Sequence, residues 1–251
     1  MRRIAERRDR GSVLKVAVVG CQTGAEVYSI AWWLRSWLPD LKLAVAAVDA
    51  ITWAVEIAKR GVYSSEAVEL TGEGACRMTE AEQDGLFDRD GNTMSVKPWL
   101  REGLSWHVAD VWDAALLDMI GMQDMVVANN CLSGTDAGKA EKALRNIARL
   151  ARPGGHVFLT GVDSDARTRV SKELGWVAIQ ESLEDVHDGD PWSRSHWPFH
   201  YAGLEPMDKG RQDWRIRYAA IFQVPQNTTA AQNGETLSGD ARNQASGLMS
   251  E

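Results

Sequence analysis

The sequence predicts an α/β fold with a seven-stranded, mostly parallel sheet that carries helices on both faces. Short β-branched runs alternate with segments whose apolar residues recur at helical spacing. The composition, 44% hydrophobic and 25% charged over 251 residues, suits one large globular domain. Alternation of this kind implies parallel strands joined by right-handed crossovers.

The first part of the chain alternates strand and helix twice. Its strands are short apolar runs, and its helices show apolar residues at positions i, i+3, i+4 and i+7. A glycine follows the first strand, and Pro39 with Asp40 stops the first helix. The predicted elements are a strand at Leu14–Val19, a helix from Val27 to Leu38, a strand at Leu43–Val48 and a helix at Thr52–Arg60.

An insertion is predicted at residues 64–103. Within it, Asp90-Gly91 stands between flanks of alternating polarity, which is typical of a β-hairpin turn. The alternation of strand and helix resumes after this small hairpin.

The second part of the chain continues the same pattern up to a polar tail. The main domain is therefore expected at residues 13–224, after an N-terminal extension at 1–12, and residues 225–251 are expected to be disordered because they hold few large apolar side chains. The predicted strands are Leu104–Ala109, Asp124–Ala128, His156–Thr160, Val177–Gln180 and Arg215–Val224, and the predicted helices are Ala140–Leu150, ended by Pro153-Gly154-Gly155, and Ala166–Leu174.

Charge and cysteine usage exclude several classes of function. The net charge of −7 argues against binding to nucleic acid or to an anionic membrane. No apolar stretch is long enough for a membrane span or a signal peptide, so a cytoplasmic location is expected. The three cysteines are widely spaced, and the acidic turn after His187 reads as a solvated loop, so no disulfide framework and no metal site are predicted.

A cofactor site is predicted where the strand order reverses, outside the carboxyl ends of the first and fourth strands. Gly20 and Gly24 permit a tight turn, and Asp49 at the end of the second strand can accept both hydroxyls of a ribose. A dinucleotide site has the spacing G-x-G-x-x-G, but Gln22 takes the middle position here. Glu26 would repel a pyrophosphate and attract an ammonium group, as in S-adenosylmethionine. The alternative is that the two glycines only make a tight turn.

Five segments together resemble a known family. VGCQTGAEVYSIAWWL, AVDAITWAVEIAKRGVY, FDRDGNTMSVKPWLREGLSWHVADVWD, DMVVANNCL and LRNIARLARPGGHVFLTG are similar, in order and spacing, to the catalytic domain of CheR-type chemotaxis methyltransferases. The resemblance covers roughly Val13 to Gly161. It implies a Rossmann-like class I methyltransferase fold, S-adenosylmethionine as cofactor, and an activity that in the family esterifies receptor glutamates.

The resemblance also implies roles for individual residues. Asp49 would hold the ribose, although Ile51 replaces a second acid of the family. Tyr28 would point near the transferable methyl group, or else simply pack within its helix. The residues implied to surround the cofactor are Gly20, Cys21, Gly24 and Glu26 at the methionine part, Asp110 and Val111 at the adenine, and Asn129 and Asn130 at the acceptor entrance.

The acceptor side departs from the family. Ser133, Gly134 and Thr135 stand where the family has an aromatic pair and its neighbour, and only about a dozen residues precede the first strand, so the family's N-terminal helical module is not expected. The aromatic-rich segment 181–214 is instead predicted to form an acceptor lid. Its His196 and His200 are candidate catalytic residues that could take a proton near neutral pH.

The main hypothesis is therefore methyl transfer to a small-molecule acceptor, aromatic or heteroaromatic. One alternative is CheR-like methylation of protein glutamates, and another is a regulatory module that binds the cofactor without turnover. An NAD-linked oxidoreductase is disfavoured by the glycine spacing. The oligomeric state, a homodimer included, stays open.

Overall fold

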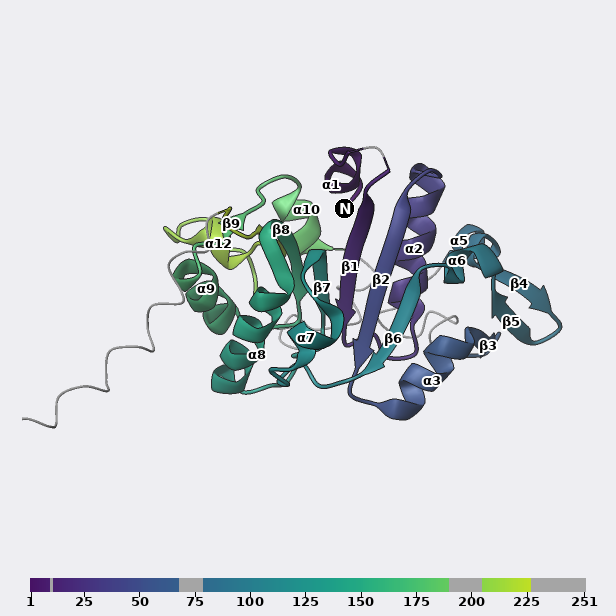
Figure 1. Cartoon of the computed structure of the whole chain (residues 1–251). Helices are drawn as coiled ribbons and strands as arrows, with labels where there is room; N and C mark the ends of the chain where they lie inside the picture. The colour runs from purple at the N-terminus through teal and green to yellow at the C-terminus, as the bar shows by residue number, and fades with distance from the viewer. Residues whose placement is uncertain (10, 68–78, 190–204, 227–251) are drawn as a thin grey trace, which may run out of the picture.

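A computed structural model describes residues 1–9, 11–67, 79–189 and 205–226 of the chain (Figure 1). Its first part contains α1 (Arg2–Glu6), β1 (Val13–Val19), α2 (Ala25–Trp37), β2 (Lys42–Asp49), α3 (Thr52–Arg60), β3 (Val62–Ser64), α5 (Glu80–Leu86), β4 (Phe87–Asp90), β5 (Thr93–Val96), α6 (Pro98–Arg101) and β6 (Leu104–Val108). Its second part contains α7 (Leu116–Ile120), β7 (Gln123–Asn129), α8 (Ala137–Leu150), β8 (Ala151–Thr160), α9 (Ser164–Glu173), β9 (Val177–Ala178), α10 (Leu183–Asp188), α12 (Trp214–Arg217) and β10 (Ile221–Gln223).

The main sheet has seven strands in the order β6-β2-β1-β7-β8-β10-β9. The first five of these run parallel, and β10 is antiparallel to both of its neighbours. The predicted α/β class with a mostly parallel seven-stranded sheet is confirmed. The strand order reverses between β1 and β7, and the parallel strands end along the lower edge of the sheet in Figure 1.

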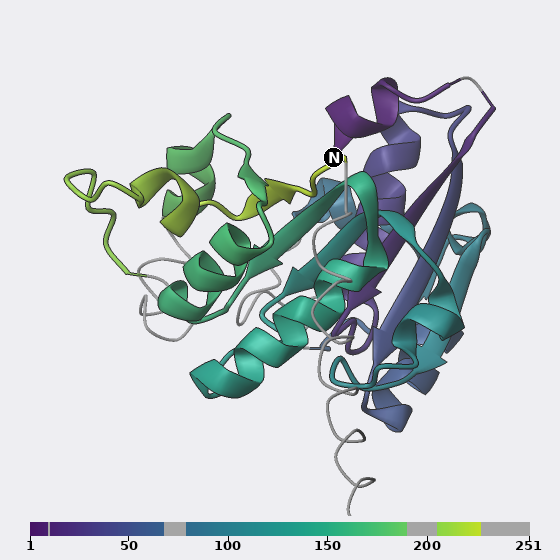
Figure 2. The same cartoon turned by 60° about the vertical axis from the view of Figure 1, so that its left-hand side comes forward.

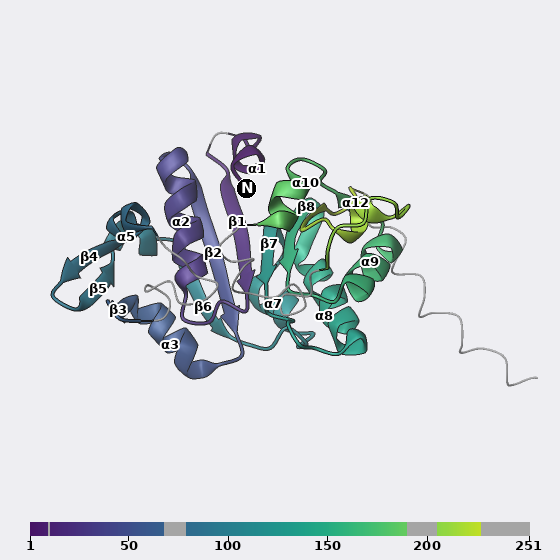
Figure 3. The ribbon, with the colours of Figure 1, turned by 180° about the vertical axis from the view of Figure 1, so that it is seen from behind.

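Alternate side chains of the central strands pack into two separate hydrophobic cores, one on each face of the sheet. Ala17 and Val19 of β1 belong to the core under α8 and α9, whereas Val16 and Val18 belong to the core under α2. The two faces of a strand alternate along the chain, so a strand buried on both faces appears as a continuous apolar run. Figures 2 and 3 show that the helices cover both faces of the sheet. Figure 3 views the molecule from behind and labels α2.

The predicted hairpin insertion forms a second, three-stranded sheet. Strands β4 and β5 pair across the turn that contains Gly91, and the short strand β3, which was not predicted, pairs with β5 on the other side. Tyr63 of β3 packs with Tyr28 of α2 and with Leu86 and Phe87 in a third core. This core fixes the small sheet against the main domain beside β6 (Figure 1).

Two predicted boundaries were wrong. The strand expected at Arg215–Val224 is only three residues long, because Trp214–Arg217 forms a helical turn in which the N–H groups of Ile216 and Arg217 bond to the Asp213 carbonyl. The helix predicted at Ala140–Leu150 does end at Leu150, but the strand expected to begin at His156 begins at Ala151 and includes Pro153-Gly154-Gly155, which was expected to be the turn after the helix. A proline disfavours helical conformation in the residue before it, and the glycines accommodate a register shift against β7.

Both chain ends that the structure describes contact the main domain. In the predicted extension 1–12, Ala5 of α1 is buried in the core under α2. The tail was expected to begin at residue 225, yet the Pro225 carbonyl accepts a hydrogen bond from the Gly154 N–H at 3.3 Å. Residues 227–251 lie outside the described part of the chain, so the prediction of disorder for them stays a prediction.

Candidate functional site

The loop after β1 lies at the reversal point of the sheet and is held by β2. The N–H groups of Gly20 and Cys21 donate to the Val48 carbonyl at 2.8 and 3.1 Å. Gly20 has φ of +76°, and a Cβ there would lie 2.4 Å from the Cβ of Cys131 in the loop after β7. No other residue fits this position, because the backbones of the two loops approach too closely. The glycine that was predicted to permit the turn thus also brings the β1 and β7 loops together.

Asp49 links the end of β2 to this loop. Its side chain is buried, with 7% of the residue exposed, and its Oδ2 accepts from the Gln22 N–H at 2.8 Å while Oδ1 accepts from the Ile51 N–H at 2.9 Å. Each carboxylate oxygen can accept more than one hydrogen bond, so capacity for a pair of hydroxyl donors is left. A role of Asp49 in binding a ribose stays a prediction.

Glu26 stands in the first turn of α2 and meets a residue from β7. Asn129 Nδ2 donates to Glu26 Oε1, and the Thr160 hydroxyl at the end of β8 donates to Asn129 Oδ1 at 3.2 Å. Burial raises the pKa of Glu26, and the hydrogen bond from Asn129 opposes that rise. A partly buried carboxylate whose charge is costly is well suited to pair with a cationic ligand group. The structure brings together Glu26 and Asn129, two residues predicted separately.

The adenine side of the predicted site follows β6. Asp110 is exposed, and its Oδ1 accepts from the Trp112 N–H at 3.1 Å, which shapes the turn after the strand. Val111 is buried, and its carbonyl accepts from Asn146 Nδ2 of α8 at 2.6 Å. Ile51 at the start of α3 is 45% exposed.

Tyr28 occupies the third core, between α2 and α3. Its hydroxyl donates to the Ala58 carbonyl at 2.7 Å, its ring centroid lies 5.6 Å from that of Trp106, and burial raises its pKa to about 12. This geometry agrees with helix packing, the alternative stated for Tyr28. A role of its hydroxyl near the methyl group stays a prediction.

Tyr63, a residue that sequence reasoning missed, reaches the predicted cofactor loop. Its hydroxyl donates to the Thr23 carbonyl at 2.6 Å. It belongs to the KRGVY element, so the family resemblance was the signal that could have found it. The contact ties the small sheet to the loop between β1 and α2.

The remaining predicted residues differ in what the structure says of them. Asn130 has φ of +55° and donates its N–H to the Thr160 carbonyl at 3.1 Å. Cys21 is buried, and burial raises the pKa of its thiol to about 12. His196 and His200 lie outside the described residues. In the described ranges, no group of three or more His, Cys, Asp or Glu side chains could hold a metal ion, and no helix is long and apolar enough to cross a membrane.

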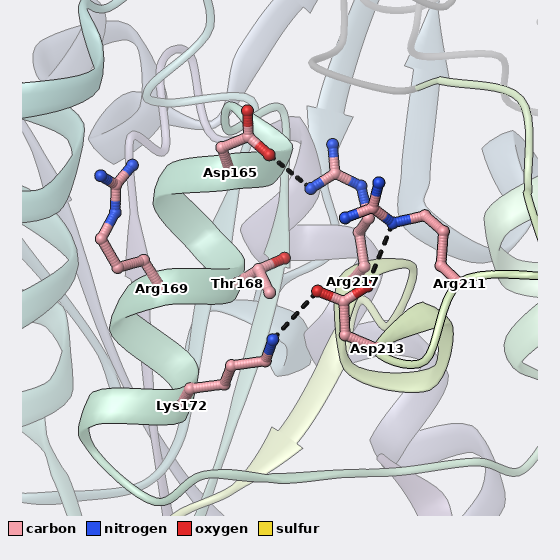
Figure 4. Close-up of a pocket in the computed structure, with 7 residues that line it drawn as sticks. All are labelled: Asp165, Thr168, Arg169, Lys172, Arg211, Asp213 and Arg217. Atoms are coloured by element: carbon pink, nitrogen blue, oxygen red, sulfur yellow. Dashed lines mark hydrogen bonds and ion pairs between the residues drawn. The ribbon is translucent and has the colours of Figure 1, made fainter.

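A separate hollow of about 480 Å³ lies between α9 and α12 (Figure 4). Ion pairs join side chains around it: Asp213 pairs with Lys172 at 2.9 Å and with Arg211 at 3.0 Å, and Asp165 pairs with Arg217 at 2.5 Å. Ion pairs of this kind link the two helices, so we assign this hollow a structural role.

Comparisons with known proteins give the family. Residues 1–171, more than half of the chain, match the family described as "CheR methyltransferase, SAM binding domain". One curated relative, a hybrid PKS-NRPS synthetase from a fungal species (strain NRRL 50135), is 35% identical over 77 residues, which are 29% of this chain and 2% of that protein.

Solved structures with a similar arrangement are distant in sequence. A putative class I S-adenosylmethionine-dependent methyltransferase from Listeria monocytogenes has a TM-score of 0.43 and 13% identity, covering 70% of this chain and 48% of its own. Magnesium protoporphyrin IX methyltransferase from Synechocystis PCC 6803, with bound SAM, has a TM-score of 0.38 and 16% identity. The match covers 66% of this chain and 61% of that protein. The chain therefore spans less than two thirds of the length of each of these proteins.

The family match extends over β1, the glycine loop, Asp49, the small sheet, Asn129 and β8, which are the parts that build the edge described above. The chain belongs to the CheR methyltransferase family, and the matched residues correspond to the part of that family described as its SAM binding domain.

Proposed function

We propose that this enzyme methylates a small-molecule acceptor, aromatic or heteroaromatic, with the cofactor held at the carboxyl edge of the sheet between β1 and β7. In this proposal Asp49 binds the ribose and Glu26 binds the ammonium of the methionine part. Asp110 faces the adenine, with Val111 packing against its ring. When bound, S-adenosylmethionine would supply a methyl group on a sulfonium: the acceptor atom would attack the methyl carbon as the carbon–sulfur bond breaks and S-adenosylhomocysteine leaves.

The placement of the cofactor is supported by the donor and acceptor groups along this edge. Asp49 and Glu26 are acceptors that lie on either side of the glycine loop, and neither has a cationic side chain within salt-bridge distance in the described part of the chain. Gly24 offers no side chain to cap α2, so the first N–H groups of this helix have no capping side chain. A dinucleotide would bring its pyrophosphate against Glu26, where like charges repel.

The proposal for the acceptor is carried by one observation, the composition and packing of the loop after Asn130. Leu132 is buried in the core under α8, the Ser133 hydroxyl donates to the Gly161 carbonyl at 3.3 Å, and Gly134 has no side chain. This loop therefore presents no aromatic group to an acceptor. We infer that acceptor contacts come from segment 181–214, which is rich in Trp and His.

The described ends of that segment support this assignment. His187 Nε2 lies 2.9 Å from the Glu205 carbonyl oxygen, so the two sides of the undescribed stretch 190–204 start close together. Arg217 binds Glu205 through two hydrogen bonds and also binds Asp165 in the first turn of α9. Because α9 follows the carboxyl end of β8, the segment is anchored on the side of the sheet where the acceptor must enter. His196 or His200 would then accept a proton where the acceptor has one to lose.

A transfer assay with a labelled methyl group tests the acceptor class. The enzyme and methyl-labelled S-adenosylmethionine are incubated with a panel of small aromatic and heteroaromatic compounds, and separately with proteins from a cell extract. We expect label in a small-molecule product, and turnover reduced in Trp197→Ala and His200→Ala with binding of S-adenosylhomocysteine retained. A substitution of Trp37 by Ala, at the exposed end of α2, provides a matched loss of a tryptophan outside the segment and away from the proposed cofactor site.

The assay also separates the second candidate, methylation of protein carboxylates, which the family match favours. Glutamate methyl esters release volatile methanol in mild base, whereas methyl groups on protein nitrogen or carbon do not. Base-released label in the protein fraction, with no labelled small molecule, would contradict the small-molecule proposal. Wild-type rates for both the Trp197 and His200 variants would contradict the placement of acceptor contacts in 181–214.

A further inference from the structure

Three side chains from three elements form a directed hydrogen-bond chain at the cofactor edge. Thr160 Oγ1 donates to Asn129 Oδ1 at 3.2 Å, and Asn129 Nδ2 donates in turn to Glu26 Oε1. Asn129 and Thr160 are register partners on neighbouring parallel strands, and the Asn130 N–H bonds to the Thr160 carbonyl at 3.1 Å. The strand pairing itself therefore holds the Thr160 hydroxyl beside the Asn129 amide.

The direction of this chain matters because an ionised carboxylate can only accept hydrogen bonds. While Thr160 donates to the amide oxygen of Asn129, the amide N–H₂ faces Glu26 and favours its charged form. A reversed amide would place an oxygen against the carboxylate, where only a protonated Glu26 could bond to it. Burial already disfavours the charge on Glu26, so the orientation of Asn129 acts on a carboxylate that needs this support.

We propose that Thr160 is a positioning residue for the cofactor: through Asn129 it holds Glu26 charged and aimed at the ammonium group of the methionine part. The inference rests on the proposed placement of the cofactor. Thr160 itself touches no part of the ligand in this proposal and acts only through the amide. Its effect is therefore confined to ligands that carry the amino acid part.

Binding of two ligands tests this by calorimetric titration. S-adenosylhomocysteine carries the amino acid part, and 5′-methylthioadenosine lacks it but keeps the adenine, ribose and sulfur. In Thr160→Val, which keeps the shape of the side chain and removes its hydroxyl, we expect binding of S-adenosylhomocysteine to weaken about three- to tenfold, since one hydrogen bond is lost. Thr160→Ser restores the hydroxyl and should restore wild-type affinity. Binding of 5′-methylthioadenosine should be equal in all three proteins.

The control ligand also reports whether each variant is folded, and Thr160→Ala serves as a second hydroxyl-free variant if valine is not tolerated. Unchanged affinity of a folded hydroxyl-free variant for S-adenosylhomocysteine would overturn the inference while leaving the proposed site intact. Equal weakening of both ligands would also overturn it, because Thr160 would then act on the whole pocket. If the wild-type protein binds neither ligand, the proposed site fails, and the inference fails with it.

Discussion

Glu26 is costly to ionise where it lies, and in the proposed site the ammonium group of the ligand would offset that cost. Burial raises its pKa from the ordinary value of a glutamate, and the residues described around it include no cationic partner within salt-bridge distance. Burial raises the pKa values of the Cys21 and Cys131 thiols in the loops after β1 and β7, and the negative charges of Asp49 and Glu26 both contribute to this rise. None of these neutralises a carboxylate, so the charge is left for the ligand.

We expect cofactor binding to depend on pH. As pH falls through the raised pKa of Glu26, the carboxylate takes up a proton and loses its attraction for the ammonium group, so affinity for S-adenosylhomocysteine should decrease. Stability of the ligand-free protein should respond in the opposite sense, because a raised folded-state pKa favours the folded state as pH falls. Titration calorimetry between about pH 5 and 8 measures the first effect.

Glu26→Gln is the matched variant for this prediction. It keeps the size and the bond to Asn129 but cannot titrate, so its affinity should be weaker and nearly constant over the same pH range. A pH dependence in Glu26→Gln equal to that of the wild type would assign the effect to another group.

At the level of single residues, the sequence was informative where a role depends on local chain position. Gly20 and Asp49 were expected at the ends of strands, and this alone places them at the carboxyl edge of the sheet. The chain from Thr160 through Asn129 to Glu26 could not be predicted, because it depends on the register between β7 and β8 and on the distance of both from α2. The bond from Tyr63 to the Thr23 carbonyl was missed for the same reason, since it joins two different sheets.

At the level of elements, the junction of α3 and β3 shows why two motifs occur together. Gly61 ends α3 with φ of +62°, and a Cβ there would lie 2.9 Å from the hydroxyl oxygen of Tyr28. The Tyr28 hydroxyl in turn donates to the Ala58 carbonyl in the last turn of α3. Gly61 of KRGVY and Tyr28 of GCQTGAEVYS therefore pack against each other. This contact holds β3 in place, and Tyr63 of β3 bonds to the loop between β1 and α2.

The prediction at this scale compares two glycine-to-alanine substitutions. Gly61 and Gly91 both have positive φ, +62° and +56°, but a Cβ at Gly91 would meet no atom within 4 Å. Gly91→Ala should cost about 1 kcal/mol of unfolding free energy, and Gly61→Ala roughly 1–3 kcal/mol more, because it also displaces Tyr28. Urea denaturation measures both values. Equal losses of unfolding free energy in the two variants would show that the contact between Gly61 and Tyr28 does not affect stability.

The errors in predicting elements have physical causes of the same kind. The apolar alternation of RIRYAAIFQV favours a strand, but ion pairs from Arg217 to Glu205 and Asp165 accompany a helical turn at Trp214–Arg217. Strand β3 was missed because its three residues are too short to show periodicity. The long, strongly periodic elements β1, α2, β2, α3 and α8 were predicted nearly to their ends, apart from the turn after α8.

At the level of the whole molecule, the carboxylates at the two edges of the sheet have different partners. At the edge where the parallel strands begin, Asp124 is buried and paired with Arg8 and Arg152, both at 2.6 Å, and it accepts from the Lys15 N–H. Its charge is thus neutralised within the fold, and these contacts link the segment after α1 to β7 and β8. At the opposite edge the carboxylates of Glu26 and Asp49 bond to amide N–H groups and have no cationic side chain within salt-bridge distance in the described part of the chain.

Hydrogen–deuterium exchange with and without S-adenosylhomocysteine tests the central claim, that the cofactor lies across the reversal point of the sheet. The ligand should slow exchange in peptides spanning residues 20–28, 49–53, 109–112 and 128–131, because these backbone segments line the proposed site. Peptides spanning 35–43 at the opposite edge, and 165–172 and 211–217 around the charged hollow, should exchange as before. Slowed exchange at the charged hollow or the opposite edge, with none in the four predicted segments, would contradict the account.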